Sequence, residues 1–504
     1  GEAIYPLVYM EKDGVRYNTL HGYKKAMNTA FQKDTITVLD EGRSVDAVID
    51  TYGKTIEKIC YEVRNVDGSR LIEDGQLQDY EQSGEQIRLH FSLKDLIESD
   101  TQYCLVFLIS TDSTEDIRYY TTIVWPKEYY VAEKLEFIRY FHELTFQDTP
   151  SRELSRYLES NSEGDNSTFS KVDIHSSLSQ VCWGELEIER LSEPVPSITD
   201  IDEQTARIIQ EYFVSTGSGS SKRIHRIRES YRIRYTTDRV YLLEFERTME
   251  QMLDSEKPGF VDNKLDLGVV DPETTFVESD DGNILVFENQ GRLFSYNVTD
   301  NKCAVLFSFF DRENGDPRTL YNRHAIKILN VDEAGNIDFA VYGYMNRGRH
   351  EGDVGIQLYY YNATVNTLEE AIYIPYDKAA DVLMCELKDF LYMNRENSLF
   401  FALEGSVYAV DLQAKSYSVL TEDVNDGALQ VSQSGKMAVW QKGQDLYACQ
   451  ELELMDLSSG NRLNITAAAE EYILPLGFIE EDLVYGLAER KDIYRDSAGK
   501  TVFP

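Results

Sequence analysis

Residues 284–297, ILVFENQGRLFSYN, join a hydrophobic run through a polar turn to a short aromatic run that ends in a polar residue. The pattern returns in the C-terminal half as LYYYN at 358–362, LFFALEGSVYAVD at 399–411, and MAVW at 437–440 with LELMD at 452–456. Hairpin-like units that recur every roughly 45–50 residues are typical of propeller blades or stacked β-units. The repeat therefore predicts a series of antiparallel sheets. It predicts architecture and not chemistry.

Length and composition predict a folded, β-rich, multidomain chain. The 504 residues are too many for one ordinary core, which predicts about two to four domains. A hydrophobic content of 42% and 34 tyrosines favour a β-rich fold over disorder. No apolar run approaches about 18 residues, so the sequence predicts no membrane-spanning segment.

The chain is strongly acidic. It carries 88 acidic and 50 basic residues, a formal charge of −38. Such a surface repels nucleic acid and anionic lipid headgroups, so we expect neither as a partner. The charge can serve solubility alone, or it can attract a cationic partner or diffuse divalent cations.

The two ends of the chain resemble the ends of a fragment. It begins at Gly1 without a methionine, and it ends at Pro504 within an expected strand. We therefore expect a piece of a longer protein, with a leader removed or a leftover glycine at its start.

Residues 1–128 alternate short strands with turns, and Asp67-Gly68 is a tight hairpin turn. We expect strands at 55–66, 86–91, 102–110 and 119–125. This spacing is typical of a β-sandwich. Immunoglobulin-like modules have a similar architecture, but this segment lacks their buried Trp between paired cysteines, so the likeness predicts architecture only.

Residues 129–257 predict an α+β domain. Apolar residues at helical spacing predict a helix over 131–144, and Thr149-Pro150 predicts the start of a second helix. Long strands are expected at 182–191, 205–214 and 224–245, with a flexible Gly-Ser tip at 217–221. Helices followed by a long-stranded antiparallel sheet form an α+β layout. The order of elements resembles cystatin-like and NTF2-like folds.

Residues 258–504 hold the repeats, and Pro258-Gly259 marks the boundary before them. Four hairpin-like units are followed by the start of a fifth at Leu483-Val484-Tyr485. A closed propeller of six to eight blades would need more chain, so we expect an incomplete one. The predicted fold class is mainly β and multidomain: an N-terminal β-sandwich, a middle α+β domain and C-terminal propeller-like blades.

Motifs for catalysis or cofactor binding are missing. The chain has no GxSxG, no zincin spacing, no phosphate loop and no CxxC among its six cysteines. Its seven histidines are scattered, with no two at metal-ligand spacing. Asp332, Gly335, Asn336 and Asp338 fit a calcium loop in part, but the EF-hand order and its closing Glu are absent, so we expect a hairpin turn. We predict no cofactor and no catalytic metal.

The cysteines and tyrosines leave two alternatives open. Cys60 and Cys104 both lie in expected strands and could pair, or they could be lone buried thiols. Tyrosines at 119–120 and 359–361 could stack on carbohydrate or a protein partner, or they could fill sheet faces.

One segment is basic in an otherwise acidic chain. Strand alternation places four arginines on one face: Arg226, Arg228, Arg232 and Arg234. The opposite face carries a credible core set: Ile227, Tyr231, Ile233 and Tyr235. A row of guanidinium groups can bind a phosphate or carboxylate polymer, or it can pair with Glu211, Glu244 and Glu246. This row is the candidate binding site that the sequence offers.

The C-terminal half resembles β-propeller proteins of the TolB or WD40 type through its hairpin rhythm, although no GH…WD signature is present. The whole chain looks like an uncharacterised bacterial envelope or surface protein. That resemblance implies an extracytoplasmic protein, secreted or anchored through a segment outside this chain. We predict a non-catalytic binding or scaffolding protein whose partner is a protein or a cell-envelope polymer. The alternative is a propeller-based enzyme, such as a carbohydrate-active hydrolase, with its site on the propeller axis or on missing blades.

Overall fold

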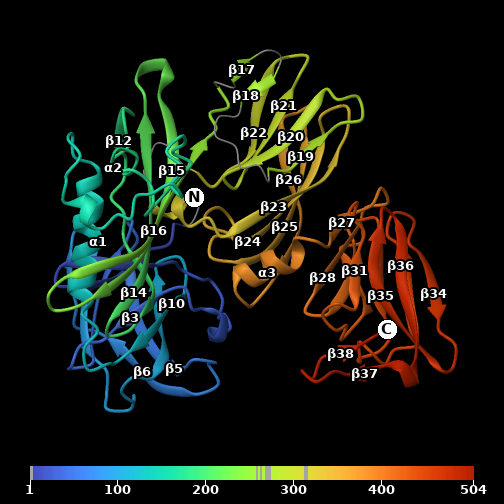
Figure 1. Ribbon diagram of the computed structural model, residues 1–504, viewed down its shortest axis with the longest axis horizontal. Helices are drawn as coiled ribbons and strands as arrows, with labels where there is room; N and C mark the ends of the chain where they lie inside the picture. Colours follow the sequence, from blue (N-terminus) through green and yellow to red (C-terminus); the bar gives the residue numbers. More distant parts are fainter. Residues whose placement is uncertain (1–3, 257–258, 262–263, 267–273, 311–315) are drawn as a thin grey trace.

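The structure is a computed structural model that describes residues 4–256, 259–261, 264–266, 274–310 and 316–504. The chain is mainly β and multidomain, and the predicted fold class is confirmed (Figure 1). No described helix is both long and apolar enough to cross a bilayer.

Two five-stranded sheets form the N-terminal β-sandwich. The first has the order β2-β1-β4-β8-β7, with strands Val15–Leu20, Leu7–Lys12, Ser44–Asp50, Gln86–Ser92 and Glu81–Ser83. The second has the order β3-β10-β9-β5-β6, with strands Ile36–Val38, Ile117–Val124, Gln102–Thr111, Ile56–Asn65 and Leu71–Leu77. Their alternating apolar residues face each other as a core, as the sequence predicts. Cys60 lies opposite Leu108 and Cys104 opposite Arg64, and both thiols are free.

The middle region is a long-stranded sheet covered by one helix. Its order is β11-β16-β15-β14-β12, with strands Lys171–Asp173, Val240–Met252, Arg223–Tyr235, Thr205–Thr216 and Ile188–Arg190; β13, Ser197–Ile201, also pairs with β14. Helix α1, Val131–Thr145, lies beside these strands (Figure 1). Its Phe141 meets Tyr231 and Phe245 at ring distances of 5.7 and 5.1 Å.

Three expected elements of this region are wrong. The second helix at Thr149-Pro150 is only the 3-10 turn η2, Leu154–Arg156. The strand at 182–191 shrinks to β12, because α2, Leu178–Val181, precedes it and Trp183 and Gly184 adopt left-handed φ values of 70° and 57°. The strand at 224–245 is divided into β15 and β16 by a turn in which the Thr236 N–H donates to the Arg239 carbonyl at 3.0 Å. The Gly-Ser tip contains η3, Gly219–Ser221.

Small antiparallel sheets follow in series, each built from strands consecutive in sequence, as in propeller blades. The first sheet contains β19 to β22: Phe276–Glu278, Ile284–Asn289, Arg292–Asn297 and Lys302–Phe307. The second contains β23 to β26: His324–Val331, Ile337–Tyr344, Val354–Asn362 and Thr367–Pro375. The third contains β27 to β30: Leu391–Met393, Ser398–Leu403, Ser406–Asp411 and Ser416–Thr421. The fourth contains β31 to β34: Leu429–Val431, Met437–Gln441, Glu451–Asp456 and Asn461–Thr466.

Shorter elements complete this half. They include the following two-stranded hairpins: β17 (Gly259–Val261) with β18 (Lys264–Asp266); β35 (Glu471–Ile479) with β36 (Asp482–Glu489); and β37 (Tyr494–Arg495) with β38 (Thr501–Val502). The helical pieces of this half are η4 (Pro317–Leu320), α3 (Ala380–Leu387) and η5 (Arg490–Asp492). A further 3-10 turn, η1 (Thr29–Phe31), lies near the start of the chain. The predicted fifth unit corresponds to β36 in a two-stranded sheet. Pro258, at the predicted boundary, lies outside the described residues.

The repeat in the sequence corresponds to the central hairpin of a sheet. In the first sheet Gln290 and Gly291 have φ values of 54° and 72°, and in the third Glu404 and Gly405 have 53° and 78°. Consecutive positive φ values are the signature of a type I′ turn, which suits the right-handed twist of the two flanking strands. The aromatic run therefore pairs back on the hydrophobic run. Both runs are largely buried in the first sheet, whereas in the third the aromatic run buries only Val407 and Val410.

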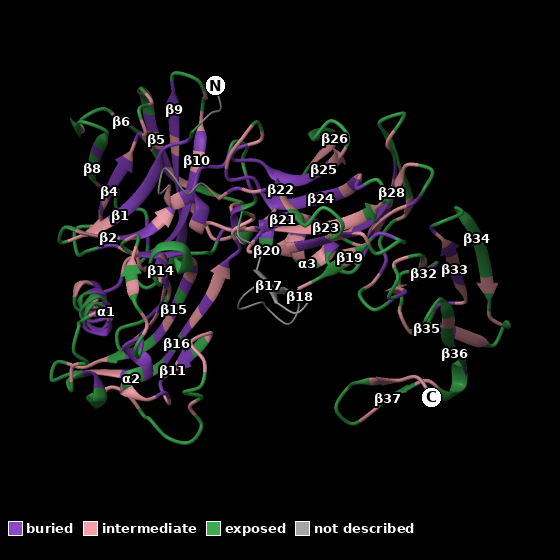
Figure 2. Cartoon of the chain, turned by 90° about the horizontal axis from the view of Figure 1, so that it is seen from above, coloured by how far each residue is buried: buried purple, intermediate pink, exposed green. Residues whose placement is uncertain are grey.

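Buried apolar residues connect these regions. One cluster runs from Val8 and Phe107 of the sandwich to Phe141 and Tyr231 of the middle region. A second joins the sandwich to the sheet β23–β26 and α3, and it includes Tyr23, Tyr120, Tyr342, Ile356 and Leu383. Whether 1–128, 129–257 and 258–504 behave as three domains stays a prediction. Burial falls toward the C-terminal end, where β34 and β36 are largely exposed (Figure 2).

Candidate functional site

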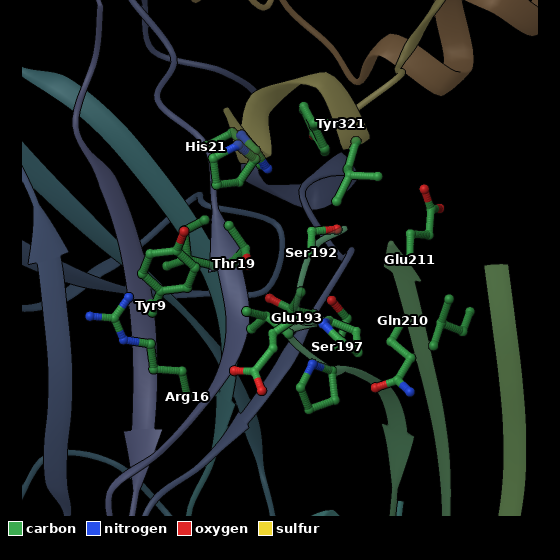
Figure 3. A pocket seen from close by; sticks show the side chains of 18 of the residues that line it. Tyr9, Arg16, Thr19, His21, Ser192, Glu193, Ser197, Gln210, Glu211 and Tyr321 are labelled. Atoms are coloured by element: carbon green, nitrogen blue, oxygen red, sulfur yellow. The ribbon is translucent and has the colours of Figure 1, made fainter. Parts of the chain in front are cut away.

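A cleft of about 1370 Å³ lies where the sandwich, the middle sheet and the segment before β23 meet; we call it the interdomain cleft. Its walls come from β2, α1, β14, β15, the loop 191–197 and residues 316–323. Figure 3 shows part of this lining, from Arg16 and His21 to Glu211 and Tyr321. Pockets for small ligands usually measure about 300–1,000 Å³. The interdomain cleft therefore has room for a segment of a polymer.

A gap in strand pairing opens into this cleft. β12 pairs with residues 214–216 of β14, and β13 pairs with residues 206–209 on the same edge. Between them, the Leu191 N–H donates to the Phe213 carbonyl at 2.8 Å, and Ser192 Oγ accepts from the Phe213 N–H at 3.1 Å. Backbone groups of alternate residues point to the same edge, so those of Glu211 do so too. Among the described residues, no hydrogen bond from this edge reaches the Glu211 N–H or C=O.

The loop 191–197 leaves this gap because the sandwich holds it. Pro194 and Pro196 have no N–H to give to a strand ladder. Asn18 of β2 donates its backbone N–H to the Pro196 carbonyl at 2.9 Å, and its Oδ1 accepts from the Ile198 N–H at 2.8 Å. Asn18 is fully buried, and its Nδ2 is fixed by the Ile36 carbonyl at 2.8 Å. One asparagine thus joins the sandwich to the rim of the cleft.

Behind the gap lies a buried carboxylate, Glu229. It accepts hydrogen bonds from His142 Nδ1 at 2.9 Å, Gln210 Nε2 at 2.8 Å, Tyr212 OH at 2.5 Å and Tyr231 OH at 2.8 Å. Burial acts to raise the pKa of Glu229, but the charge and hydrogen bond of His142, with Arg247 and Tyr212, lower it to about 2. Glu229 is therefore ionised, and His142 Nδ1 is the donor to it.

The other ring nitrogen of His142 is buried and unpaired among the described residues. His142 is 3% exposed and lies in the cleft wall, and its Nε2 has no hydrogen-bond partner among the described residues. Arg247 is also fully buried, but it does not line the cleft. Its guanidinium stacks on Trp183 at 3.4 Å and donates to the Val181 carbonyl at 2.8 Å. A polar ligand group can thus satisfy an atom that the fold leaves unpaired.

A second wall of the cleft is aromatic. His21 stacks on Tyr321 at a ring distance of 3.8 Å, and Tyr321 OH and Tyr23 OH are 2.9 Å apart. Burial first, then the charges of Arg318 and Arg323, lower the pKa of His21 to about 3. His21 is therefore neutral at physiological pH and serves as a flat, uncharged surface.

Near this wall, Glu351 ties the chain's beginning to the sheet β23–β26. Its Oε1 accepts from the Tyr5 N–H at 2.9 Å and lies 3.4 Å from Arg318 Nε. Arg318 also pairs with Asp316 at 3.0 Å and stacks on Tyr52 at 4.4 Å. Burial raises the pKa of Glu351 to about 7, against the lowering effects of the Tyr5 N–H and Arg318.

The four predicted arginines share a face, with Ile227, Tyr231 and Ile233 buried opposite them. Arg226 pairs with Glu211 and donates to the Leu320 carbonyl at 2.5 Å, so it joins the middle sheet to η4. Arg228 lies 3.8 Å from Glu211, Arg232 lies 3.7 Å from Glu244, and Arg234 stacks on Tyr241 at 4.7 Å. Arg226 and Arg228 line the cleft; Arg232 and Arg234 do not. Their role in binding stays a prediction.

The charges around the cleft are largely paired. Seven carboxylates and five arginines line it, and Arg190, Arg318 and Arg347 pair with lining carboxylates from outside the lining. Arg190 is shared by Glu143 at 2.8 Å and Glu193 at 3.7 Å, so one negative charge there is left over. Asp34 accepts a hydrogen bond from Tyr321 OH at 3.4 Å. The corner of the cleft at Glu143 and Glu193 therefore favours a cationic group over an anionic one.

The other candidates from the sequence, the calcium-like loop and the tyrosine pairs, lie in a turn and on sheet faces. Asp332 closes the hairpin between β23 and β24, with its Oδ1 accepting from the Asn336 N–H at 2.8 Å, so this segment is a turn. The described residues contain no group of His, Cys, Asp or Glu side chains that could hold a metal. Tyr119 and Tyr120 are buried in the sandwich, and the tyrosines at 359–361 are partly buried on β25.

The sequence analysis did not single out the residues that build the site, although strand alternation or helical spacing indicates that some of them are buried. Glu229 lies in β15 between Ile227 and Tyr231, so alternation places it inward. His142 follows Ile138 by one helical turn on the buried face of α1. Lys134 is also buried there, and it donates to the Asp202 carbonyl at 2.6 Å; burial lowers its pKa to about 8. Asn18 and Glu351 carry no such signal, because their partners are remote in sequence.

Comparisons with known proteins give distant likenesses only. No protein-family model matches the chain, and no curated protein is significantly similar to it. Among solved structures, TolB from Acinetobacter baumannii is similar with 9% identity and a TM-score of 0.24, over 73% of this chain and 78% of that one.

Two further solved structures are similar at the same level. A putative TolB from Agrobacterium tumefaciens has 13% identity and a TM-score of 0.21, over 45% of this chain and 79% of that one. Dipeptidyl peptidase 4 from Porphyromonas gingivalis has 10% identity and a TM-score of 0.22, over 56% and 49% of the two chains. At these scores the architecture rests on the chain's own sheets, and function rests on the cleft.

Proposed function

We propose that this chain is a non-catalytic binding or scaffolding protein of a bacterial cell envelope, outside the cytoplasm, and that the interdomain cleft is its binding site. The single observation that carries the binding role is the cleft itself, about 1370 Å³ between three regions of the chain. Clefts between domains are common places for ligands. The propeller-like sheets then serve as a scaffold and as a further surface for protein partners.

The chemistry of the cleft supports binding over catalysis. Its arginines are held by carboxylates, as in Arg16 with Asp50 at 3.1 Å and Arg323 with Asp381 at 2.9 Å. A catalytic acid–base group needs a pKa near the working pH, and burial lowers that of His21 to about 3, so His21 serves as a contact surface in an aromatic stack. Paired charges and flat aromatic rings supply orientation and contact area instead. The alternative, an enzyme with its site on the propeller axis, predicts turnover of a ligand that never enters this cleft.

Site-specific photo-crosslinking tests the proposal. Benzoylphenylalanine replaces Leu191, which is 44% exposed at the rim of the cleft, or Leu96, which is 56% exposed on the sandwich and outside the cleft. In cells that carry the whole gene, we expect adducts at position 191 and none at position 96. Equal adducts at both positions, or none at 191, would contradict the proposal.

Location is tested in the same cells. Cys385 is an exposed free cysteine on α3. A thiol reagent that does not cross membranes should label it in intact cells if the protein lies outside the cytoplasm. Labelling only after lysis would contradict the extracytoplasmic part of the proposal, and it would not bear on the proposal that the cleft is a binding site.

A further inference from the structure

We propose that the interdomain cleft binds an extended peptide with basic side chains, and that this peptide forms a short β-bridge with Glu211 in the gap between β12 and β13. This inference rests on the proposed function, which it deepens by naming the ligand class. Its basis is a strand edge that the fold leaves open inside the cleft, together with the acidic pair Glu143 and Glu193 at the rim.

The geometry of β14 supplies the peptide contact. β12 ends its pairing at Val214 and β13 begins its pairing at Ile209, so the ladder on this edge is interrupted between them. The Glu211 N–H and C=O face this interruption and find no partner there among the described residues. An unpaired donor and acceptor on one residue match the donor and acceptor of a single residue in an extended peptide.

The loop opposite keeps the gap open in two ways. Pro194 and Pro196 cannot donate to the ladder. Asn18 holds the Pro196 carbonyl at 2.9 Å and the Ile198 N–H at 2.8 Å, which fixes the loop on the sandwich. Ser192 and Ser197 lie on the loop side of the cleft, and Glu211 lies on the strand side (Figure 3). The opening is therefore a fixed feature of the fold, and binding need not displace a strand.

A buried polar atom lies in the wall of the same cleft. Gln210 and His142 both line the cleft, and both hold Glu229. The Nε2 of His142 is buried without a partner among the described residues. A polar group of a ligand that enters the gap can bond to it, which satisfies an atom that is costly to leave unpaired.

Charge selects basic side chains. Glu143 and Glu193 compete for Arg190, and the Glu193 side chain is 86% exposed at the rim. The whole chain carries a formal charge of −38, which attracts a cationic segment from a distance. Arg226 and Arg228 share the single carboxylate of Glu211, so the acidic group that selects a basic side chain is the pair Glu143 and Glu193 at the rim.

A designed peptide tests the inference. The probe is Ac-Val-Lys-Val-Lys-Val-NH2, and its matched control carries an N-methyl group on the central Val, which removes one backbone donor and blocks strand pairing. We expect binding of the probe to weaken by about tenfold or more in the control. Hydrogen exchange at residues 209–213 should slow with the probe and not with the control. Equal binding of both peptides, or unchanged exchange, would overturn the inference.

A charge variant tests the selectivity. Glu193→Lys should weaken binding of the probe by up to about fivefold. Glu333→Lys makes the same charge change on an exposed turn outside the cleft, and it should leave binding unchanged. A peptide with Glu in place of Lys should not bind. Preference for that acidic peptide would overturn the inference.

Failure of this inference is distinguishable from failure of the proposed function. If adducts still form at position 191 while the probe neither binds nor slows exchange, the cleft is a binding site for another class of ligand. A glycan adduct at position 191 would be that result, and it overturns the peptide assignment alone.

Discussion

Glu229 in the middle sheet and Glu351 beside the sheet β23–β26 are both buried, with 0% and 3% exposure, yet their surroundings favour opposite charge states. Four side-chain donors surround Glu229, and its pKa falls to about 2. Glu351 has one backbone N–H and a longer contact with Arg318, its Oε2 lacks a partner among the described residues, and its pKa rises to about 7. Burial alone does not decide the charge of a carboxyl group, because the number of donors around it does.

The largest expected effect comes from removing the Glu229 carboxylate. Glu229→Ala leaves the partners of a buried charge uncompensated, and we expect the free energy of unfolding to fall by about 3–5 kcal/mol in urea titrations. Glu244→Ala removes two exposed ion pairs, with Arg207 and Arg232, from the neighbouring strand β16 and should cost about 0–1 kcal/mol for each. Equal losses in the two variants would contradict the role given to Glu229.

The next prediction concerns pH and distinguishes the two carboxyl groups. The folded-state pKa of Glu351 is raised, so its stabilising contribution is complete below about pH 4.5 and is lost as the pH rises through about 7. We expect a loss of up to about 3 kcal/mol over this range, and Glu351→Gln should abolish it. Glu229 behaves oppositely: its contribution is present above about pH 4.5 and is lost as the pH falls through about 2. Urea titrations across pH should show both signs.

A smaller effect comes from a neutral buried residue. Asn18→Ala removes the acceptor of the Ile198 N–H and the donor to the Ile36 carbonyl, and we expect a loss of about 1–3 kcal/mol. Asn18 has a φ of 53°, which Asn tolerates better than Ala. Asn18→Gly makes the same deletion without that strain, so the difference between the two variants isolates the backbone cost. Faster proteolysis of the loop 191–197 in both variants should accompany the loss.

The smallest expected effect is on the arginine row. Arg228→Glu and Arg232→Glu each break an exposed ion pair, which is worth about 0–1 kcal/mol. Melting should therefore hardly change in either variant. Loss of binding to an anionic polymer, with unchanged melting, would assign the row as a binding surface. Lower melting without any binding defect would assign it as structural.

Local patterns in the sequence predict much of the fold. The repeat beginning at Ile284 identifies hairpins because alternation and a Gly turn are local properties. Alternation in β15 also separates the arginines from Ile227 and Tyr231 correctly. The expected strand at 182–191 fails at Trp183, whose left-handed φ of 70° no local pattern reveals. The expected second helix fails because Leu154 and Leu158 alone do not define an amphipathic face.

The candidate site was less predictable because it is assembled from distant segments. The sequence draws attention to Arg226 and Arg228, which do reach the cleft, and there they share the one carboxylate of Glu211. The gap at Glu211 depends on where β12 and β13 pair, and that register is set by Asn18, about 180 residues earlier. Long-range pairing of this kind leaves no periodic signal in the chain.

The contact between Tyr5 and Glu351 has a consequence for how the protein is made. The two residues are 346 positions apart, and the contact between the hydroxyl groups of Tyr23 and Tyr321 also joins distant parts of the chain. At a synthesis rate of about 5–20 residues per second, roughly 17–70 s pass before the first residues can meet their partners. During that interval the nascent sandwich exposes the apolar surface around Tyr23 that α3 and β25 later cover. The start of the chain is therefore the part most dependent on protection by chaperones during translation.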